Sequence, residues 1–348
     1  METIIGHEGV RRELRSLALG PEPPHAILLT GPHGIGRELL AREYAALLNC
    51  EAEPEARPCG ECRACRLIAE RTHPDVVTLG PGDTLCKPRP DEAHEKHPQS
   101  RDIRICQVRG LIELVARYPF EGRDRVVVIE PADVLGREAS HTILKTLEEP
   151  PPHTTFVLIT SAPEQLIETI ISRCRRIDAR IVPRTVIEAG LLARGIEPGL
   201  AARAAQEARG RPGRAVAFAA KPDLMGDLDR LLERCAAIVT APTAERFAYA
   251  SDLAERWRRD RSLVTGELDA WEVYWERRLR RASLDEPGFT PEETLDALRA
   301  IEQARTDLQA QVMTRPALEL MLLSFPRGTM DGTPDAAEDE GRPVPHAG

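Results

Sequence analysis

The hydrophobic pattern of the first half of the chain alternates between two periods. Continuous apolar runs rich in β-branched residues predict buried strands at 25–30, 125–130 and 154–160. Apolar residues at helical spacing predict helices at 37–48 and 137–149, and three consecutive prolines end the second helix. Strands that alternate with helices predict a parallel sheet with helices on both faces. A ligand of such a sheet binds at the carboxyl ends of the strands.

The pattern changes in the second half. Short helices separated by Gly and Pro are expected over 178–222, and longer helices over 223–326. The segment 80–101 is polar and Pro-rich, which indicates a mobile surface loop whose role the sequence does not define. Residues 327–348 are acidic and rich in Gly and Pro, which is typical of a disordered tail.

Composition and charge exclude several classes of protein. The chain has 348 residues, enough for about two or three domains. It carries 47 basic and 56 acidic residues, a net charge of −9, which argues against gripping DNA by charge alone. No apolar segment resembles a signal peptide or is long enough to cross a membrane. We therefore expect a cytoplasmic protein whose cysteines are reduced thiols or metal ligands.

Half of the eight cysteines cluster in the segment 50–66. Cys50, Cys59, Cys62 and Cys65 are spaced as C-x8-C-x2-C-x2-C. Four thiolates at this spacing predict a closed tetrahedral Zn²⁺ site with a structural role. Four unrelated thiols or an iron–sulfur cluster are the alternatives. The other four are expected to be ordinary packed or surface thiols: Cys86, Cys106, Cys174 and Cys235.

The first predicted strand leads into GPHGIGRELL, a near match to a phosphate-binding loop. Gly31, Gly34 and Gly36 can shape a cradle of backbone N–H groups. Arg37 stands where the pattern has Lys, and its planar fork does not replace an ammonium neutrally. Glu38 stands where a hydroxyl holds Mg²⁺. Taken alone, such a loop is as well explained by a chance Gly-rich turn.

The second predicted strand ends in a defective acid pair. Glu130 occupies the position of the metal-binding acid, and Pro131 occupies that of the acid that activates water. A proline ring cannot orient or deprotonate water. The phosphate-binding loop and the acid pair have therefore both lost side chains that ATP hydrolysis requires. The sequence leaves open whether ATP or ADP binds without being hydrolysed.

Two longer segments resemble a known family. ILKTLEEPP (143–151), followed by TTFVLITSAPEQLIETIISRC (154–174), is similar to the bacterial DNA polymerase III clamp loader subunits of the AAA+ superfamily. The resemblance covers residues 1 to about 220 and includes the four-Cys segment and IIGHEGVRREL (4–14). AQVMTRPALELMLL (310–323) resembles the last helix of the clamp loader collar.

The resemblance implies a fold and its division into domains. It implies an α/β AAA+ P-loop domain, a parallel sheet flanked by helices, over 1–177 with the inserted zinc module. A small helical lid would follow at 178–222, an all-α collar domain for oligomerisation at 223–326, and the acidic tail at 327–348.

Among these subunits the chain is most similar to the delta-prime type, which implies a member that does not hydrolyse ATP. Gly213 stands where the lid of an active AAA+ protein has a nucleotide-sensing Arg, and Arg214 is one residue late. Ser172-Arg173-Cys174 matches the family's SRC motif, whose Arg acts in trans as an arginine finger. The neighbouring Arg175 and Arg176 are expected to be solvated charges.

The implied partners are the gamma/tau and delta clamp loader subunits, with the sliding clamp and primed DNA reached through their complex, and no membrane. Two alternatives remain. One is an ATP-hydrolysing, gamma/tau-like motor, against which the altered nucleotide motifs argue. The other is a zinc-dependent DNA-binding adaptor, against which the acidic charge and the lack of aromatic and basic residues interleaved near 50–66 argue.

Overall fold

The computed structural model describes residues 3–82, 84–88, 100–221, 223–284, 288–309 and 313–327. Most of the predicted loop at 80–101, and all of the predicted tail beyond Arg327, lie outside the described residues. The chain divides into two compact units, Met1–Ala220 and Lys221–Gly348.

A five-stranded sheet with parallel pairing throughout forms the centre of the first unit. Its strands are β1 (Ala26–Thr30), β2 (Val76–Leu79), β3 (Arg125–Ile129), β4 (Thr154–Thr160) and β5 (Arg175–Asp178), in the order β2–β3–β4–β1–β5. Every residue of β1, β3 and β4 is buried, and these central strands are the three predicted from apolar runs. The edge strands escaped prediction because they are short and partly exposed: β5 buries only Ile177.

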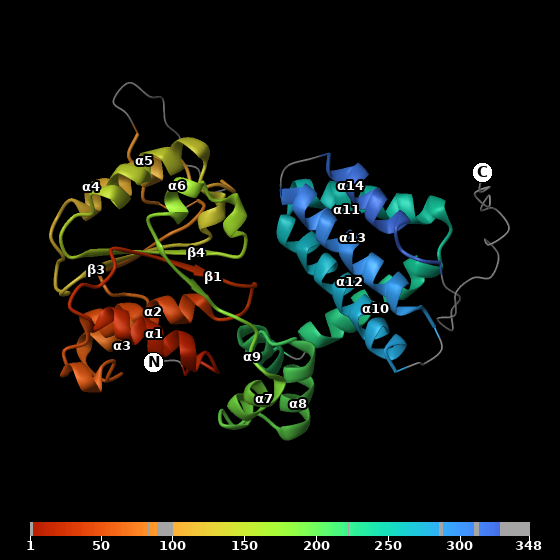
Figure 1. Ribbon diagram of the computed structural model, residues 1–348, viewed down its shortest axis with the longest axis horizontal. Helices are drawn as coiled ribbons and strands as arrows, with labels where there is room; N and C mark the ends of the chain where they lie inside the picture. The colour runs from red at the N-terminus through yellow and green to blue at the C-terminus, as the bar shows by residue number, and fades with distance from the viewer. Residues whose placement is uncertain are drawn as a thin grey trace, which may run out of the picture. The chain divides into compact units, whose positions relative to one another are not determined.

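The alternation of side chains along the central strands supplies two cores. In β1, Ile27 and Leu29 join one core, whereas Ala26 and Leu28 join the other. Helices cover both faces of the sheet (Figure 1). One face carries α1 (Glu8–Ala18), α2 (Arg37–Asn49) and α3 (Arg63–Ala69), and the opposite face carries α4 (Ile105–Val115), α5 (Arg137–Glu148) and α6 (Glu168–Ile171). Short 3-10 helices stand at η1 (Pro54–Ala56), η2 (Ala132–Val134) and η3 (Pro163–Gln165).

Three helices complete the first unit after β5. They are α7 (Arg184–Leu192), α8 (Pro198–Glu207) and α9 (Pro212–Ala220), and they pack on one another through small side chains such as Ala204 and Ala215. Short helices were predicted in this region from its Gly and Pro residues, and the structure confirms them.

The second unit is helical throughout its described residues. It consists of α10 (Asp223–Thr240), α11 (Thr243–Arg259), α12 (Arg261–Ala282), α13 (Pro291–Gln309) and α14 (Thr314–Leu323). Trp271 and Trp275 pack against Phe325, with ring centroids 4.8 and 5.3 Å apart. Buried Arg246 donates to the carbonyls of Leu322 and Phe325 and thereby ties α11 to the end of α14. The predicted class, an α/β P-loop domain followed by helical parts, is confirmed.

Candidate functional site

The near-P-loop lies at the carboxyl end of β1, where the sheet topology predicts a ligand. The chain passes from Thr30 into the Gly-rich turn and then into α2, which begins at Arg37. Gly31 has a φ of 142°, and a Cβ there would lie 2.3 Å from the carbonyl oxygen of Ala179. Only glycine fits this close passage of two backbones. Gly31 therefore allows the loop to pass close to the chain that follows β5.

Arg37 turns back onto the loop that should receive phosphate. It is 6% exposed, and its guanidinium donates to the carbonyl of Gly31. Burial lowers the pKa of Arg37, although the carboxylates of Glu130 and Asp133 partly offset this. The cation at the Lys position is thus engaged with the loop itself.

Glu38 and Glu130 place two further carboxylates at this site. Glu38 forms ion pairs with Arg42 and Arg71, with nitrogen–oxygen distances of 3.2 and 3.0 Å. The pKa of Glu130 is raised, first by burial and then by the Glu38 carboxylate. No hydroxyl is offered at residue 38, so the ligand set that a P-loop uses for Mg²⁺ is incomplete.

The position expected to activate water is occupied by a proline, as the sequence indicates. Pro131 precedes the short helix η2. The next acid, Asp133, accepts a hydrogen bond from the Thr160 hydroxyl at 2.5 Å. Thr160 is buried at the end of β4, and the sequence analysis did not identify it. A hydroxyl directly after the apolar run FVLI was the available signal.

The N-terminus of α9 packs directly on the P-loop. The backbone N–H of Gly213 donates to the carbonyl of Gly34 at 2.8 Å. A Cβ at Gly213 would lie 2.8 Å from that same oxygen, so no larger residue fits without a shift. The guanidinium of Arg214 lies over the ring of Phe218, 5.2 Å from its centroid. Gly213 therefore makes a backbone contact between α9 and the glycine-rich loop.

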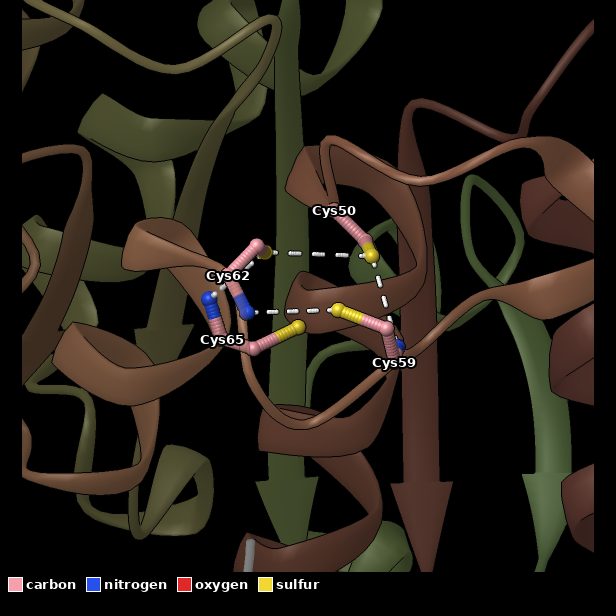
Figure 2. A group of neighbouring side chains, drawn as sticks. All are labelled: Cys50, Cys59, Cys62 and Cys65. Carbon is pink, nitrogen blue, oxygen red and sulfur yellow. Dashed lines mark hydrogen bonds between the residues drawn. The ribbon is translucent and has the colours of Figure 1, made fainter.

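The structure brings the four clustered cysteines together, as predicted (Figure 2). Cys50 follows the end of α2 and Cys62 caps the start of α3, while Cys59 and Cys65 approach from the loop and from α3. All four sulfurs lie within 4.8 Å of one another, and those of Cys50 and Cys62 are 3.9 Å apart. Four sulfurs around zinc at about 2.3 Å have edges of about 3.8 Å, so this arrangement fits a tetrahedral ion.

Backbone groups favour thiolate in this cluster. The N–H of Cys62 donates to the sulfur of Cys59 at 3.3 Å, and that of Cys65 donates to the sulfur of Cys62 at 3.5 Å. Hydrogen bonds from the backbone of Cys62 and Glu61 lower the pKa of Cys59 to about 6, whereas burial raises the pKa of Cys65. Within the described residues, these cysteines are the group of metal-ligating side chains close enough to share one ion.

A single arginine of α1 anchors the cysteine loop to the rest of the unit. Arg15 donates to the carbonyls of Pro54, Glu55 and Arg57. Cys50 and Cys65 are also part of the core beneath the sheet. The module is thus continuous with the fold. Among the four remaining cysteines, none forms a disulfide.

Arg173 lies beyond the end of α6 and is one-third exposed. Its guanidinium donates to the carbonyl of Thr169 at 2.8 Å and forms an ion pair with Glu148 at 2.5 Å. Arg175 and Arg176 are more exposed, at 59% and 50%, and pair with other acids. Glu148 was not identified as a site residue from the sequence. Its position in the KTLEEPP segment carried the resemblance, but only the fold places it beside Arg173.

Among the described residues, no helix combines the length and apolar character needed to span a bilayer.

The protein family described as DNA polymerase III, delta subunit, matches residues 6–182. DNA polymerase III subunit delta' of Pseudomonas aeruginosa is 41% identical over 150 residues, which are 43% of this chain and 41% of that protein. Subunit delta' of Escherichia coli is 34% identical over 151 residues, 43% of this chain and 41% of that protein. Subunit tau of Bacillus subtilis is 34% identical over 187 residues, 53% of this chain and 30% of that protein. The matches thus span less than half the length of each of these relatives.

Proposed function

Because the chain belongs to the family described as DNA polymerase III, delta subunit, we propose that it is a delta-prime-like subunit of the clamp loader. It would assemble with gamma/tau and delta subunits in the cytoplasm. The complex would open the sliding clamp and load it onto primed DNA during chromosome replication. The subunit itself would not hydrolyse ATP.

The observation that carries this proposal is the state of the nucleotide site. Arg37 donates to the loop carbonyl of Gly31 instead of extending toward a ligand. Pro131 cannot activate water, and Gly213 has no side chain to sense a γ-phosphate. The three residues stand at positions with different tasks: phosphate binding, activation of water and sensing of the γ-phosphate. Losing any one of these tasks would therefore impair ATP hydrolysis. A nucleotide that binds without being hydrolysed would contact Gly31, Gly34, Gly36 and Arg37.

Membership of this family also suggests how the chain is divided into domains. We assign the AAA+ domain to 1–177, the lid to 178–222, the collar to 223–326 and an acidic tail to 327–348. The four cysteines would hold a structural Zn²⁺, which when bound supplies a fixed cross-link between α2, the loop and α3. This loop has little apolar material of its own, and Arg15 supports it by hydrogen bonds to its backbone.

Arg173 is assigned the role of an arginine finger. In this role its guanidinium would stabilise the charge that develops on phosphoryl oxygens in the nucleotide site of a neighbouring ATPase subunit. Its partial exposure and its place in the SRC motif support the assignment.

The test is the ATPase rate of the reconstituted complex in the presence of clamp and primed DNA. Arg173→Ala should lower the rate at the neighbouring site by about 10³-fold or more, and the total rate by less, because other sites keep their own fingers. Arg173→Lys should retain only part of the ATPase rate, since Lys lacks the planar fork of the guanidinium. Arg175→Ala is the matched control. The isolated chain should show no turnover above background. Turnover that is lost in a Gly36 variant would instead favour the gamma/tau-like motor.

Equal rates for wild type and Arg173→Ala, with assembly intact, would refute the finger and leave a scaffold role. Assembly is verified first by size-exclusion chromatography of each reconstituted complex.

A further inference from the structure

Two elements hold the guanidinium of Arg173 in one place. From α6, the carbonyl of Thr169 accepts a hydrogen bond at 2.8 Å, and the Ser172 hydroxyl lies 3.4 Å from the same nitrogen. From α5, the carboxylate of Glu148 accepts from the other terminal nitrogen at 2.5 Å. Acceptors on different sides of a planar fork fix its orientation as well as its position.

The location of Glu148 is not explained by the helix to which it belongs. It is the last residue of α5, where the helix dipole disfavours a carboxylate. The side chain is 48% exposed, so the ion pair with Arg173 adds little to the stability of the fold. A charge that is unfavourable for its own helix, and of little value to the fold, is in contact with a side chain proposed to act on another subunit.

We propose that Glu148 is a positioning residue for Arg173. It holds the guanidinium against α6 in the orientation from which it reaches the neighbour's phosphoryl group, and it acts only through Arg173. This inference rests on the finger role proposed above. Its consequence is that the finger is ordered before the subunits meet, so that its side-chain entropy is not lost during catalysis.

The chain contains a matched control. Arg175 and Glu13 form an ion pair of the same chemistry, with a nitrogen–oxygen distance of 2.9 Å and exposures of 59% and 39%. Glu13→Gln removes one carboxylate from a surface ion pair with an arginine, as Glu148→Gln does, but leaves Arg173 and its acceptors unchanged. Any general effect of losing a surface charge should be the same in both variants.

The experiment is a double-mutant cycle in the reconstituted complex. Glu148→Gln, Arg173→Ala and the double variant are compared by kcat and KM of the clamp-stimulated ATPase. Glu148→Gln should lower kcat by about three- to tenfold, toward the lower end of the coupling found between residues in direct contact, with KM within about twofold. It should cause no further loss in the Arg173→Ala background. Glu148→Asp, which keeps the charge, should recover part of kcat, and Glu13→Gln should match wild type.

The outcomes separate the two proposals. If Arg173→Ala leaves the rate unchanged, the finger role fails and this inference fails with it. If Arg173→Ala lowers the rate but Glu148→Gln equals wild type or exceeds it, the finger stands and the positioning role is overturned. The positioning role is also overturned if Glu148→Gln lowers the rate equally in the presence and absence of Arg173. Thermal unfolding of each variant chain, measured alone, should be the same as that of wild type.

Discussion

Asp75 shows how much order one buried carboxylate can supply. Its side chain is fully buried, and it accepts hydrogen bonds from the backbone N–H groups of Phe120, Glu121 and Gly122 at 2.6–2.8 Å. Arg125 pairs with it at 3.1 Å. Burial opposes its charge, but these hydrogen bonds and the ion pair together lower the pKa of Asp75 below the ordinary value of 3.8. Single residues of this kind fix a loop that has no regular structure.

Asp75→Asn should destabilise the first unit by about 3 kcal/mol or more at pH 7, because Arg125 is left buried without its counter-ion. A group with a depressed pKa stabilises the fold fully above its ordinary pKa, and this contribution is lost as the pH falls through the lowered value. The difference between wild type and variant should therefore be large at pH 7 and smaller at pH 3. Urea unfolding at both values is the measurement. A difference that is equal at pH 7 and pH 3 would contradict this reading.

At the scale of elements, a contact between α9 and the glycine-rich loop links the helices after β5 to the sheet. Gly34 and Gly213 bring two backbones to hydrogen-bonding distance, at 2.8 Å. This hydrogen bond fixes the start of α9 against the loop that follows β1.

Gly213→Ala should disrupt this contact. Its Cβ would lie 2.8 Å from a backbone oxygen, so α9 or the loop must shift. Overpacking of this kind costs about 1–3 kcal/mol. We expect a lower unfolding midpoint and faster hydrogen exchange at Gly213 and along α9, with β1 and β4 unaffected. Gly226→Ala in α10 is the control, because its added Cβ meets no atom within 4 Å. Exchange in α9 that matches wild type would show that the contact does not hold the lid.

At the scale of the whole molecule, the two compact units have separate cores. The cysteine cluster is part of the core of Met1–Ala220, in which Cys50 and Cys65 are buried. Lys221–Gly348 has its own core, centred on Trp271 and Trp275. Units with separate cores can unfold separately.

We therefore expect the chain to unfold in two transitions and to contain about one zinc. Cys62→Ser should lower only the transition of the first unit and reduce the zinc content. All three tryptophans are in the second unit, so their fluorescence reports its transition alone. Cys235→Ser, in α10, is the control for loss of a thiol. Zinc-free protein purified without chelator, or a tryptophan transition that moves with Cys62→Ser, would contradict the expectation.

The sequence by itself determined the features that local chemistry fixes. The apolar runs predicted β1, β3 and β4, because a strand buried on both faces is apolar over most of its length. The spacing of the four cysteines predicted their convergence. Two-residue spacers keep Cys59, Cys62 and Cys65 near one another, and Cys50 lies only nine positions before Cys59. The substitutions at Arg37 and Pro131 could also be identified from the sequence, because they lie within short motifs.

Only the tertiary structure decided which residues meet across long separations. The edge strand β5 forms because β1 offers it backbone partners, although its own sequence, RRID, is polar. The contact of Gly34 with Gly213 and the pairing of Glu148 with Arg173 depend on where helices end in space. A sequence pattern records how each segment buries its own side chains. It does not record which neighbour a polar group finds, because that choice depends on the packing of the whole unit.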